Sequence, residues 1–211
     1  MTQHTTGALP APVVACLGEA RELGFFGPGP LEGQLAHALA FAHAVDVLDG
    51  ARCVDIGSGG GLPALVLAAV WPSTRWTLVD SMRKRTSFLE RSVAALGWED
   101  RVEVLLGRTE DVVCQPGRRH AASLVTARGF GRPSRTAEAA AAFLSLGGRL
   151  VVSEPPGWED RWPRERLGLL GLVPERTWRG EVGLRVLRQS SACPPSFPRA
   201  AAAQAKAPLW D

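Results

Sequence analysis

A glycine-rich turn near position 57 contains the residues best suited to hold a ligand closely. A short apolar stretch ends just after Asp55, and the sequence Gly-Ser-Gly-Gly-Gly that follows leads into a second apolar segment beginning at Leu62. Without side chains at Gly57, Gly59 and Gly61, the backbone can turn tightly, adopt positive φ and approach a ligand. A strand, a glycine turn and a helix in this order are typical of nucleotide-binding α/β folds, in which the ligand lies at the carboxyl end of the strand.

Carboxylates around this turn indicate which nucleotide it holds. A dinucleotide fingerprint needs a third glycine at position 62, where this chain has leucine, whereas Asp55 stands two residues before the first glycine. Asp55 can neutralise an ammonium group or order a water beside it, and Asp80, at the end of the next apolar stretch, can accept hydrogen bonds from both ribose hydroxyls. The polar turn 107–110 can bracket an adenine. The pattern therefore predicts S-adenosylmethionine (SAM) as the cofactor, with a dehydrogenase and a cofactor-free binding module as alternatives.

The elements that position these residues alternate short apolar strands with longer helical stretches, the pattern of a parallel sheet covered by helices. We expect strands at 52–56, 76–79, 102–106, 123–127 and 149–153, and helices at 62–70, 82–96, 110–113 and 134–146, the last stopping at a Gly-Gly pair. A helix near 161–170 precedes two alternating runs, 175–178 and 183–189, that suit a hairpin. The predicted fold class is α/β: a class I SAM-methyltransferase Rossmann-like sheet, mostly parallel with an antiparallel C-terminal hairpin, preceded by N-terminal helices.

Composition along the chain predicts one folded domain with two unstructured ends. Residues 1–10 are small and polar, and we expect them to be disordered. A single methyltransferase domain is expected over 11–189, with an N-terminal helical extension over 11–48 and a SAM-binding core over 49–189. The extension contains two helical stretches, 12–23 and 31–48, joined by a loop rich in Gly and Pro. Residues 190–211 are rich in Pro and Ala with few large apolar groups, which predicts a disordered tail.

Composition also argues against several classes of protein. The four cysteines are scattered, without a CxxC pair or histidines at ligand spacing, so we expect neither a metal site nor disulfides. The longest apolar run, 62–71, is far shorter than the roughly 20 residues of a membrane helix, and the N-terminus lacks a signal-peptide pattern. The net charge of +3 attracts nucleic acid only if the fold gathers the arginines on one face. We expect a cytoplasmic monomer without metal or membrane contact.

Motifs at the strand ends resemble the bacterial RsmG/GidB family, which methylates guanine N7 in small-subunit (16S) ribosomal RNA. The resemblance covers about residues 31–190, and its stretches are DIGSGGGLP from Asp55, LVDS from Leu78 with Lys84-Arg85, FLE from Phe88, RTE from Arg108 and VTAR from Val125. The Leu-Pro after the glycines and the Thr-Ala-Arg are its most specific parts. It implies SAM contacts from Gly57, Leu62, Thr109, Glu110 and Arg128, which join Asp55, Gly59, Gly61 and Asp80.

Two departures from the family pattern lie on the substrate side. The family usually has an Arg-His and an Asp-Ser in the helix before the first strand, where this chain reads Gly-Gln-Leu-Ala-His-Ala from Gly33. A lysine that usually follows the fifth strand is replaced by Glu154. Glu154 is interpreted either as a solvated loop charge or as an acid that faces the substrate, and in the second case it would repel RNA phosphate.

The predicted reaction is SAM-dependent transfer of methyl to guanine N7 of 16S rRNA, with the small ribosomal subunit as partner. N7 has an in-plane lone pair, so direct in-line attack needs alignment and exclusion of water but no general base. Arg128 is the candidate for positioning the acceptor, either through the O6 edge of the base or by holding a phosphate, or else it forms an ion pair with a carboxylate such as Asp80 or Glu110. Trp158 and Trp162 are candidates for stacking on the base. Two alternatives stay open: methylation of a small molecule or other acceptor, and an inactive SAM-binding interaction domain.

Overall fold

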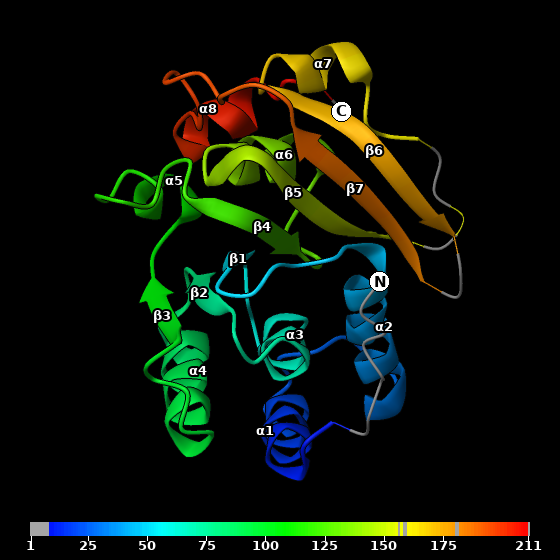
Figure 1. The fold of residues 1–211 in the computed structure, drawn as a ribbon, viewed down its shortest axis with the longest axis vertical. Coiled ribbons are helices and arrows are strands. Elements are labelled where there is room, and N and C mark those ends of the chain that lie inside the picture. Colours follow the sequence, from blue (N-terminus) through cyan, green and yellow to red (C-terminus); the bar gives the residue numbers. More distant parts are fainter. Residues whose placement is uncertain (1–8, 156, 158–159, 180–181, 211) are drawn as a thin grey trace.

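The computed structural model describes residues 9–210 except 156, 158–159 and 180–181, and its centre is one seven-stranded sheet (Figure 1). The strands are β1 (Arg52–Ile56), β2 (Arg75–Asp80), β3 (Val102–Leu106), β4 (Ala122–Ala127), β5 (Leu144–Glu154), β6 (Leu172–Arg179) and β7 (Gly183–Gln189). Their order is β3-β2-β1-β4-β5-β7-β6. β1 to β5 pair in parallel, and β7 is antiparallel to both β5 and β6. The predicted mostly parallel sheet with an antiparallel hairpin is confirmed.

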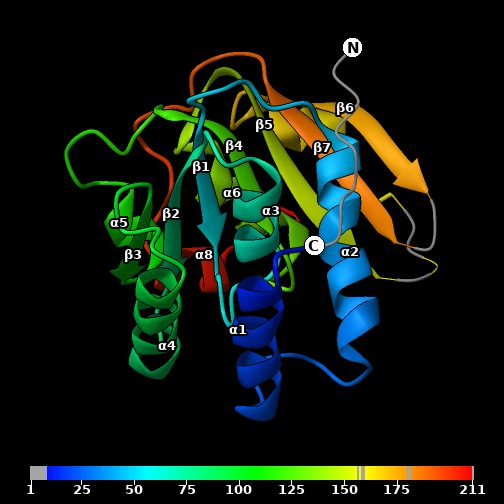
Figure 2. The ribbon, with the colours of Figure 1, turned by 60° about the horizontal axis from the view of Figure 1, so that its bottom comes forward.

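Helices cover both faces of the sheet (Figures 1 and 2). One face carries α1 (Ala11–Glu22), α2 (Leu31–Ala44), α3 (Ala64–Val70) and α4 (Arg83–Ala95). The other carries α5 (Thr109–Val112), α6 (Pro133–Ala141), α7 (Arg164–Gly168) and α8 (Ala201–Lys206). Among the helices of the described residues, none has the length and apolar character needed to cross a membrane.

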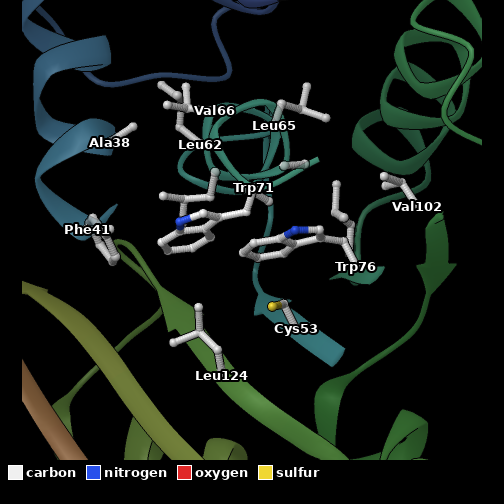
Figure 3. Packing of buried hydrophobic residues seen from close by; sticks show 14 of the residues in the cluster. Ala38, Phe41, Cys53, Leu62, Leu65, Val66, Trp71, Trp76, Val102 and Leu124 are labelled. Carbon is white, nitrogen blue, oxygen red and sulfur yellow. The ribbon is translucent and has the colours of Figure 1, made fainter. Parts of the chain in front are cut away.

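Successive residues of the central strands point to opposite faces, which divides the apolar core into two clusters. In β1, Cys53 packs toward α2 and α3, whereas Val54 and Ile56 pack toward α6. Figure 3 shows Trp71 and Trp76 between α3 and the sheet, where they are 4% and 2% exposed. Burial of large side chains contributes roughly 2–3 kcal/mol each. Both faces of β1 are therefore buried, and the glycine turn at its end rests on a packed support.

The helix expected over 134–146 ends at Ala141, because the chain joins the sheet earlier than the sequence suggested. The N–H of His120 donates to the carbonyl of Ala142, and the N–H of Ala122 donates to that of Phe143. β5 therefore begins at Leu144, and the Gly-Gly pair falls where its register against β4 shifts. The helix expected over 31–48 similarly ends at residue 44.

The segment 190–210, expected above to be disordered, is folded onto α6 and α7 in the structure. Arg199 donates to the buried carboxylate of Glu138 from Nε, Nη2 and its backbone N–H at 2.7–2.8 Å. Trp210 is 9% exposed, and its Nε1 donates to the carbonyl of Arg161 at 3.0 Å. An ion pair with a buried partner and one large aromatic side chain anchor a segment that composition alone classed as disordered. Of the N-terminal stretch 1–10, residues 1–8 lie outside the described residues.

Candidate active site

The strand order has a switch point between β1 and β4: β2 and β3 are added on one side of β1, and β4 and β5 on the other. Crossover helices on either side of such a switch point leave space above the carboxyl ends of the strands, which is where α/β sheets bind ligands. The glycine turn follows β1, Asp80 ends β2, the turn 107–110 follows β3 and Arg128 follows β4. The structure therefore brings the predicted site residues to one edge of the sheet, although their individual positions differ.

The three glycines of the predicted cradle have different surroundings. Gly57, Gly59 and Gly61 all adopt positive φ, at 69°, 55° and 97°. A Cβ on Gly57 would lie 2.8 Å from Phe130, and one on Gly61 would lie 2.5 Å from Leu65. A Cβ on Gly59 would meet only a backbone oxygen at 3.8 Å. Gly61 thus makes room for Leu65 of α3 and Gly57 for Phe130, whereas the space beside Gly59 is open to a ligand.

Asp80 is nearly buried, and its carboxylate already holds the glycine turn in place. Oδ2 accepts from the N–H of Gly59 and Oδ1 from the N–H of Met82, both at 2.9 Å. Arg85 places Nη1 3.6 Å from Oδ2. Each carboxylate oxygen has a second acceptor position, so two hydroxyl groups can still bind to Asp80.

Two cavities meet at Gly57, and we name them by their charged residues. The Asp80 cavity, of about 210 Å³, is lined by residues of the β2, β3 and β4 ends, among them Asp80, Arg108, Thr109, Glu110 and Phe130. The Arg128 cavity, of about 270 Å³, is lined by Phe25, Phe26, Gly57–Gly60, Leu62, Arg85 and Arg128, among others. Both include Gly57, Arg85 and Gly129. An elongated ligand can therefore span the glycine turn with one end in each cavity.

Asp55 lies beneath the glycine turn and lines neither cavity. Its Oδ1 accepts from the hydroxyl of Thr126 at 2.6 Å, which joins β1 to β4. Its Oδ2 is buried without a hydrogen-bond partner in the part of the chain that the structure describes. Burial raises the pKa of this carboxyl to about 7. An unpaired, desolvated carboxylate oxygen is stabilised by a cation bound nearby.

Arg128 extends toward α2, where Nη2 donates to Oε1 of Gln34. Among the described residues, Arg128 forms no ion pair with the two expected carboxylates: Asp80 pairs with Arg85, and Glu110 accepts from Thr109 and Gln204. The carboxylate that interacts electrostatically with Arg128 is Asp55. Burial lowers the pKa of Arg128, and burial together with Arg128 lowers the pKa of His37 to about 4. At neutral pH, the residues of the altered helix that interact with Arg128 are therefore a neutral amide, Gln34, and a neutral imidazole, His37.

Glu154 is neither a solvated charge nor an acid that faces the substrate. It is 5% exposed, and its two oxygens accept from Nε1 of Trp162 and Nη2 of Arg161. Trp162 is itself 2% exposed, so the expectation that it stacks on an acceptor base is wrong. Trp158 lies outside the described residues. The exchange of lysine for Glu154 thus adds an internal ion pair, and no free negative charge reaches the site.

Several residues of the cavity walls were missing from the prediction. Phe25 and Phe26 come from the loop between α1 and α2, and a Cβ on Gly60 would lie 2.7 Å from Phe26. Phe130 and Arg135 follow β4, with the guanidinium of Arg135 5.2 Å from the Phe130 ring centroid. An aromatic pair inside a loop of glycines and prolines was the only signal for the first two. Nothing in the sequence pointed to Arg135.

These features together define a class I SAM-dependent methyltransferase. The parallel sheet, the glycine turn at its switch point and the unpaired Asp55 oxygen suit a cofactor with a ribose, an adenine and an ammonium group. A solved SAM-dependent methyltransferase from Aquifex aeolicus has the same fold, with a TM-score of 0.58, 15% identity and coverage of 82% of this chain and 98% of that one.

The family is shown by sequence. The model for the GidB family, described as rRNA small subunit methyltransferase G, matches residues 32–154. Two relatives named Ribosomal RNA small subunit methyltransferase G cover most of the chain. That of Moorella thermoacetica is 30% identical over 79% of this chain and 72% of its own. That of Symbiobacterium thermophilum is 31% identical over 85% and 80%. The chain belongs to this family and is an enzyme that uses SAM.

Proposed function

We propose that this enzyme methylates guanine N7 of 16S rRNA in the small ribosomal subunit. The observation that carries the proposal is the lining of the two joined cavities. One cavity presents carboxylates and hydroxyls suited to adenosine, and the other presents two phenylalanines and Arg128. Among the described residues that line the Arg128 cavity, where the acceptor would bind, none is Asp, Glu, His, Cys or Lys. Such a site suits an acceptor that carries its own lone pair and gives up no proton to a basic side chain.

We assign the cofactor contacts by cavity. In the Asp80 cavity, Asp80 accepts from the two ribose hydroxyls, while Thr109 and Glu110 border the adenine. At the junction, Gly57 and Gly59 allow close approach of the backbone, and Leu62 closes the Arg128 cavity from below the turn. Asp55 supplies a negative charge beneath the ammonium group, and Gly61 acts indirectly by letting α3 pack against the turn. The family's pattern and the positions described above support these roles.

In our proposed mechanism, the enzyme aligns guanine N7 with the methyl group of SAM. When bound, SAM supplies an electrophilic methyl group for direct transfer. Arg128 donates to the O6 edge of guanine and leaves N7 free to attack, and Gln34 holds the guanidinium in that position. Phe25 and Phe26 exclude water from the same cavity, which keeps the nucleophile and Arg128 in a medium of low dielectric constant. A carbon–nitrogen bond forms, a carbon–sulfur bond breaks, and no proton is transferred.

The pKa of Asp55 predicts how SAM affinity depends on pH. Because a bound cation favours the ionised carboxyl, affinity should fall by up to about tenfold per pH unit below about pH 7 and level off above it. Titration calorimetry at several pH values measures this. Asp55→Asn keeps an acceptor for Thr126 and should remove the dependence. Equal affinity of the natural enzyme at about pH 6 and about pH 8 would contradict the role of Asp55.

The raised pKa of Asp55 also predicts how the stability of the cofactor-free protein depends on pH. The pKa of Asp55 is raised above its ordinary value of 3.8, so the folded state binds the proton more tightly than the unfolded state. The contribution of Asp55 to the free energy of unfolding is then greatest below about pH 4 and declines as pH rises toward about 7. SAM should offset that decline, because it stabilises the ionised form.

The reaction itself is tested with small ribosomal subunits that lack the modification. Labelled methyl should pass from SAM to the RNA and appear as 7-methylguanosine after nucleoside analysis. Label in another nucleoside would overturn the choice of N7. No label, with SAM binding intact in the same preparation, would overturn the ribosomal proposal and favour another acceptor or an interaction domain. The burial of Glu154 removes one of the two sequence features that had favoured a small-molecule acceptor.

A further inference from the structure

A second hollow lies beside the cofactor site, between the start of α6 and α8, and we call it the α6–α8 groove. Its volume is about 890 Å³, against about 210 and 270 Å³ for the Asp80 and Arg128 cavities. It is lined by Arg108, Gly131, Arg132, Ser134, Arg135, Ala201, Ala202, Gln204, Ala205 and Pro208. The adenosine and methionine parts of the proposed cofactor site lie elsewhere, so the groove is available to another ligand.

The groove is basic on one wall and carries only short side chains on much of the other. Arg108, Arg132 and Arg135 are exposed and come from the β3 end and the start of α6. None of its described lining residues is Asp or Glu. The guanidinium groups of Arg108 and Arg135, on walls whose described residues include no carboxylate, create a positive potential that attracts phosphate. Arginine also presents paired donors that match phosphate oxygens.

The groove is continuous with the cofactor site. Arg108 and Arg135 line both the groove and the Asp80 cavity. The Arg135 guanidinium lies over the Phe130 ring, and Phe130 in turn contacts Gly57 at the junction of the two cavities. A polymer with its reacting base in the Arg128 cavity could therefore continue its backbone into the groove.

The second wall is held in place by contacts with the site. Gln204 of α8 donates from Nε2 to Oε1 of Glu110 at 3.3 Å and to the carbonyl of Arg199 at 2.6 Å. Arg199 is fixed in turn by the carboxylate of Glu138, which is buried in α6. Figure 1 shows α8 beside α6 and close to α5. Because α8 is anchored at both α5 and α6, the groove is a defined surface of the folded enzyme.

We propose that the α6–α8 groove binds the phosphate backbone of single-stranded RNA next to the guanine that is methylated. The choice of RNA rests on the proposed function, while the affinity for phosphates rests on the groove itself. Two phosphates would bind to Arg108 and Arg135, and the alanines of α8 leave room for sugar and base. The groove then increases affinity for the acceptor strand without contacting the reacting atoms.

A matched pair of substitutions in α8 tests this directly. Ala202 and Ala203 are adjacent and exposed, but only Ala202 lines the groove. Ala202→Glu should weaken binding of a labelled single-stranded RNA oligonucleotide at least about tenfold at low salt, whereas Ala203→Glu should change it no more than about twofold. Fluorescence anisotropy gives both values, and thermal unfolding checks that the two variants fold alike. Equal losses in the two variants would overturn the proposal.

Removing the arginines should change the salt dependence. For Arg108→Ala and Arg135→Ala combined, the slope of log affinity against log salt should become shallower by about 1.4, at roughly 0.7 per phosphate contact. Arg52→Ala serves as the control, because Arg52 is exposed at the opposite, amino-terminal end of β1. An unchanged slope in this double variant would also overturn the proposal.

The two proposals fail in different ways. RNA binding that depends on Ala202 and the arginines, without formation of 7-methylguanosine, would refute the ribosomal reaction and leave the groove standing. Methylation of small subunits with an unchanged KM for the Ala202→Glu variant would refute the groove and leave the reaction standing. Sensitivity to Ala202→Glu with intact subunits but not with naked RNA would show a protein contact, which would overturn the assignment to RNA.

Discussion

Asp80→Ala is expected to weaken SAM binding by about two orders of magnitude. The carboxylate can still accept two hydroxyls, and hydrogen bonds to a charged group contribute about 1.5–3 kcal/mol each. Loss of two at the lower figure corresponds to a factor of about 100 or more in the dissociation constant. The turn should also loosen, because Gly59 and Met82 lose their acceptor. Titration calorimetry measures the affinity.

A milder variant and a distant one separate binding from folding. Asp80→Asn preserves the size of the side chain and keeps one acceptor for the N–H groups of Gly59 and Met82, so it should bind SAM more weakly than the natural enzyme while losing less stability than Asp80→Ala. Asp49→Ala removes an exposed carboxylate that is bonded to Ser73, away from the crevice, and should leave affinity unchanged. If Asp80→Asn binds SAM with natural affinity, the assignment of the ribose to Asp80 fails.

Arg128→Ala is expected to reduce kcat/KM for the RNA acceptor by about 100-fold, with SAM affinity changed much less. Its guanidinium is partly desolvated in the Arg128 cavity, and loss of one charged donor at a buried site costs about 3 kcal/mol. Steady-state rates with SAM and small subunits varied separately distinguish the two effects. Full activity on the acceptor would remove Arg128 from the site.

Two companion variants test how Arg128 is positioned. Arg128→Lys keeps a positive charge but loses the planar pair of donors, and it should recover only part of the activity. Gln34→Ala leaves Arg128 intact and removes its hydrogen-bond partner, so it should lower kcat while KM for SAM stays the same. Natural kcat in Gln34→Ala would show that α2 does not position Arg128.

The sheet could be predicted because its signals are local. The strands at 52–56 and 102–106 have the predicted bounds, since short apolar runs flanked by turns leave little freedom in placement. The end of α6 could not be predicted, because Ala-Ala-Phe-Leu continues a helical pattern and only pairing with Ala122 draws it into β5. The folded segment after Ser190 depends on Glu138, a residue in another element.

In the candidate site, too, features set by local sequence could be predicted and those set by contacts between distant residues could not. Asp80 and the turn 107–110 could be predicted to lie together because the carboxyl ends of parallel strands must meet at one edge, whatever the details of packing. Glu154 was misread because its partner Trp162 lies eight residues away and folds back over it, a contact that composition and spacing do not encode. Phe25 reaches the cavity through the packing of the loop after α1.

The wall formed by α8 also bears on the order in which the enzyme folds. Its contacts join residues far apart in the chain: Gln204 to Glu110 across 94 positions, Arg199 to Glu138 across 61 and Trp210 to Arg161 across 49. Closing such long loops costs entropy that must be offset by elements already formed. During synthesis from the N-terminus, β1 to β4 and α6 are complete before Gln204 is made. The support for Glu110 and the second wall of the groove are therefore late-folding parts of the molecule.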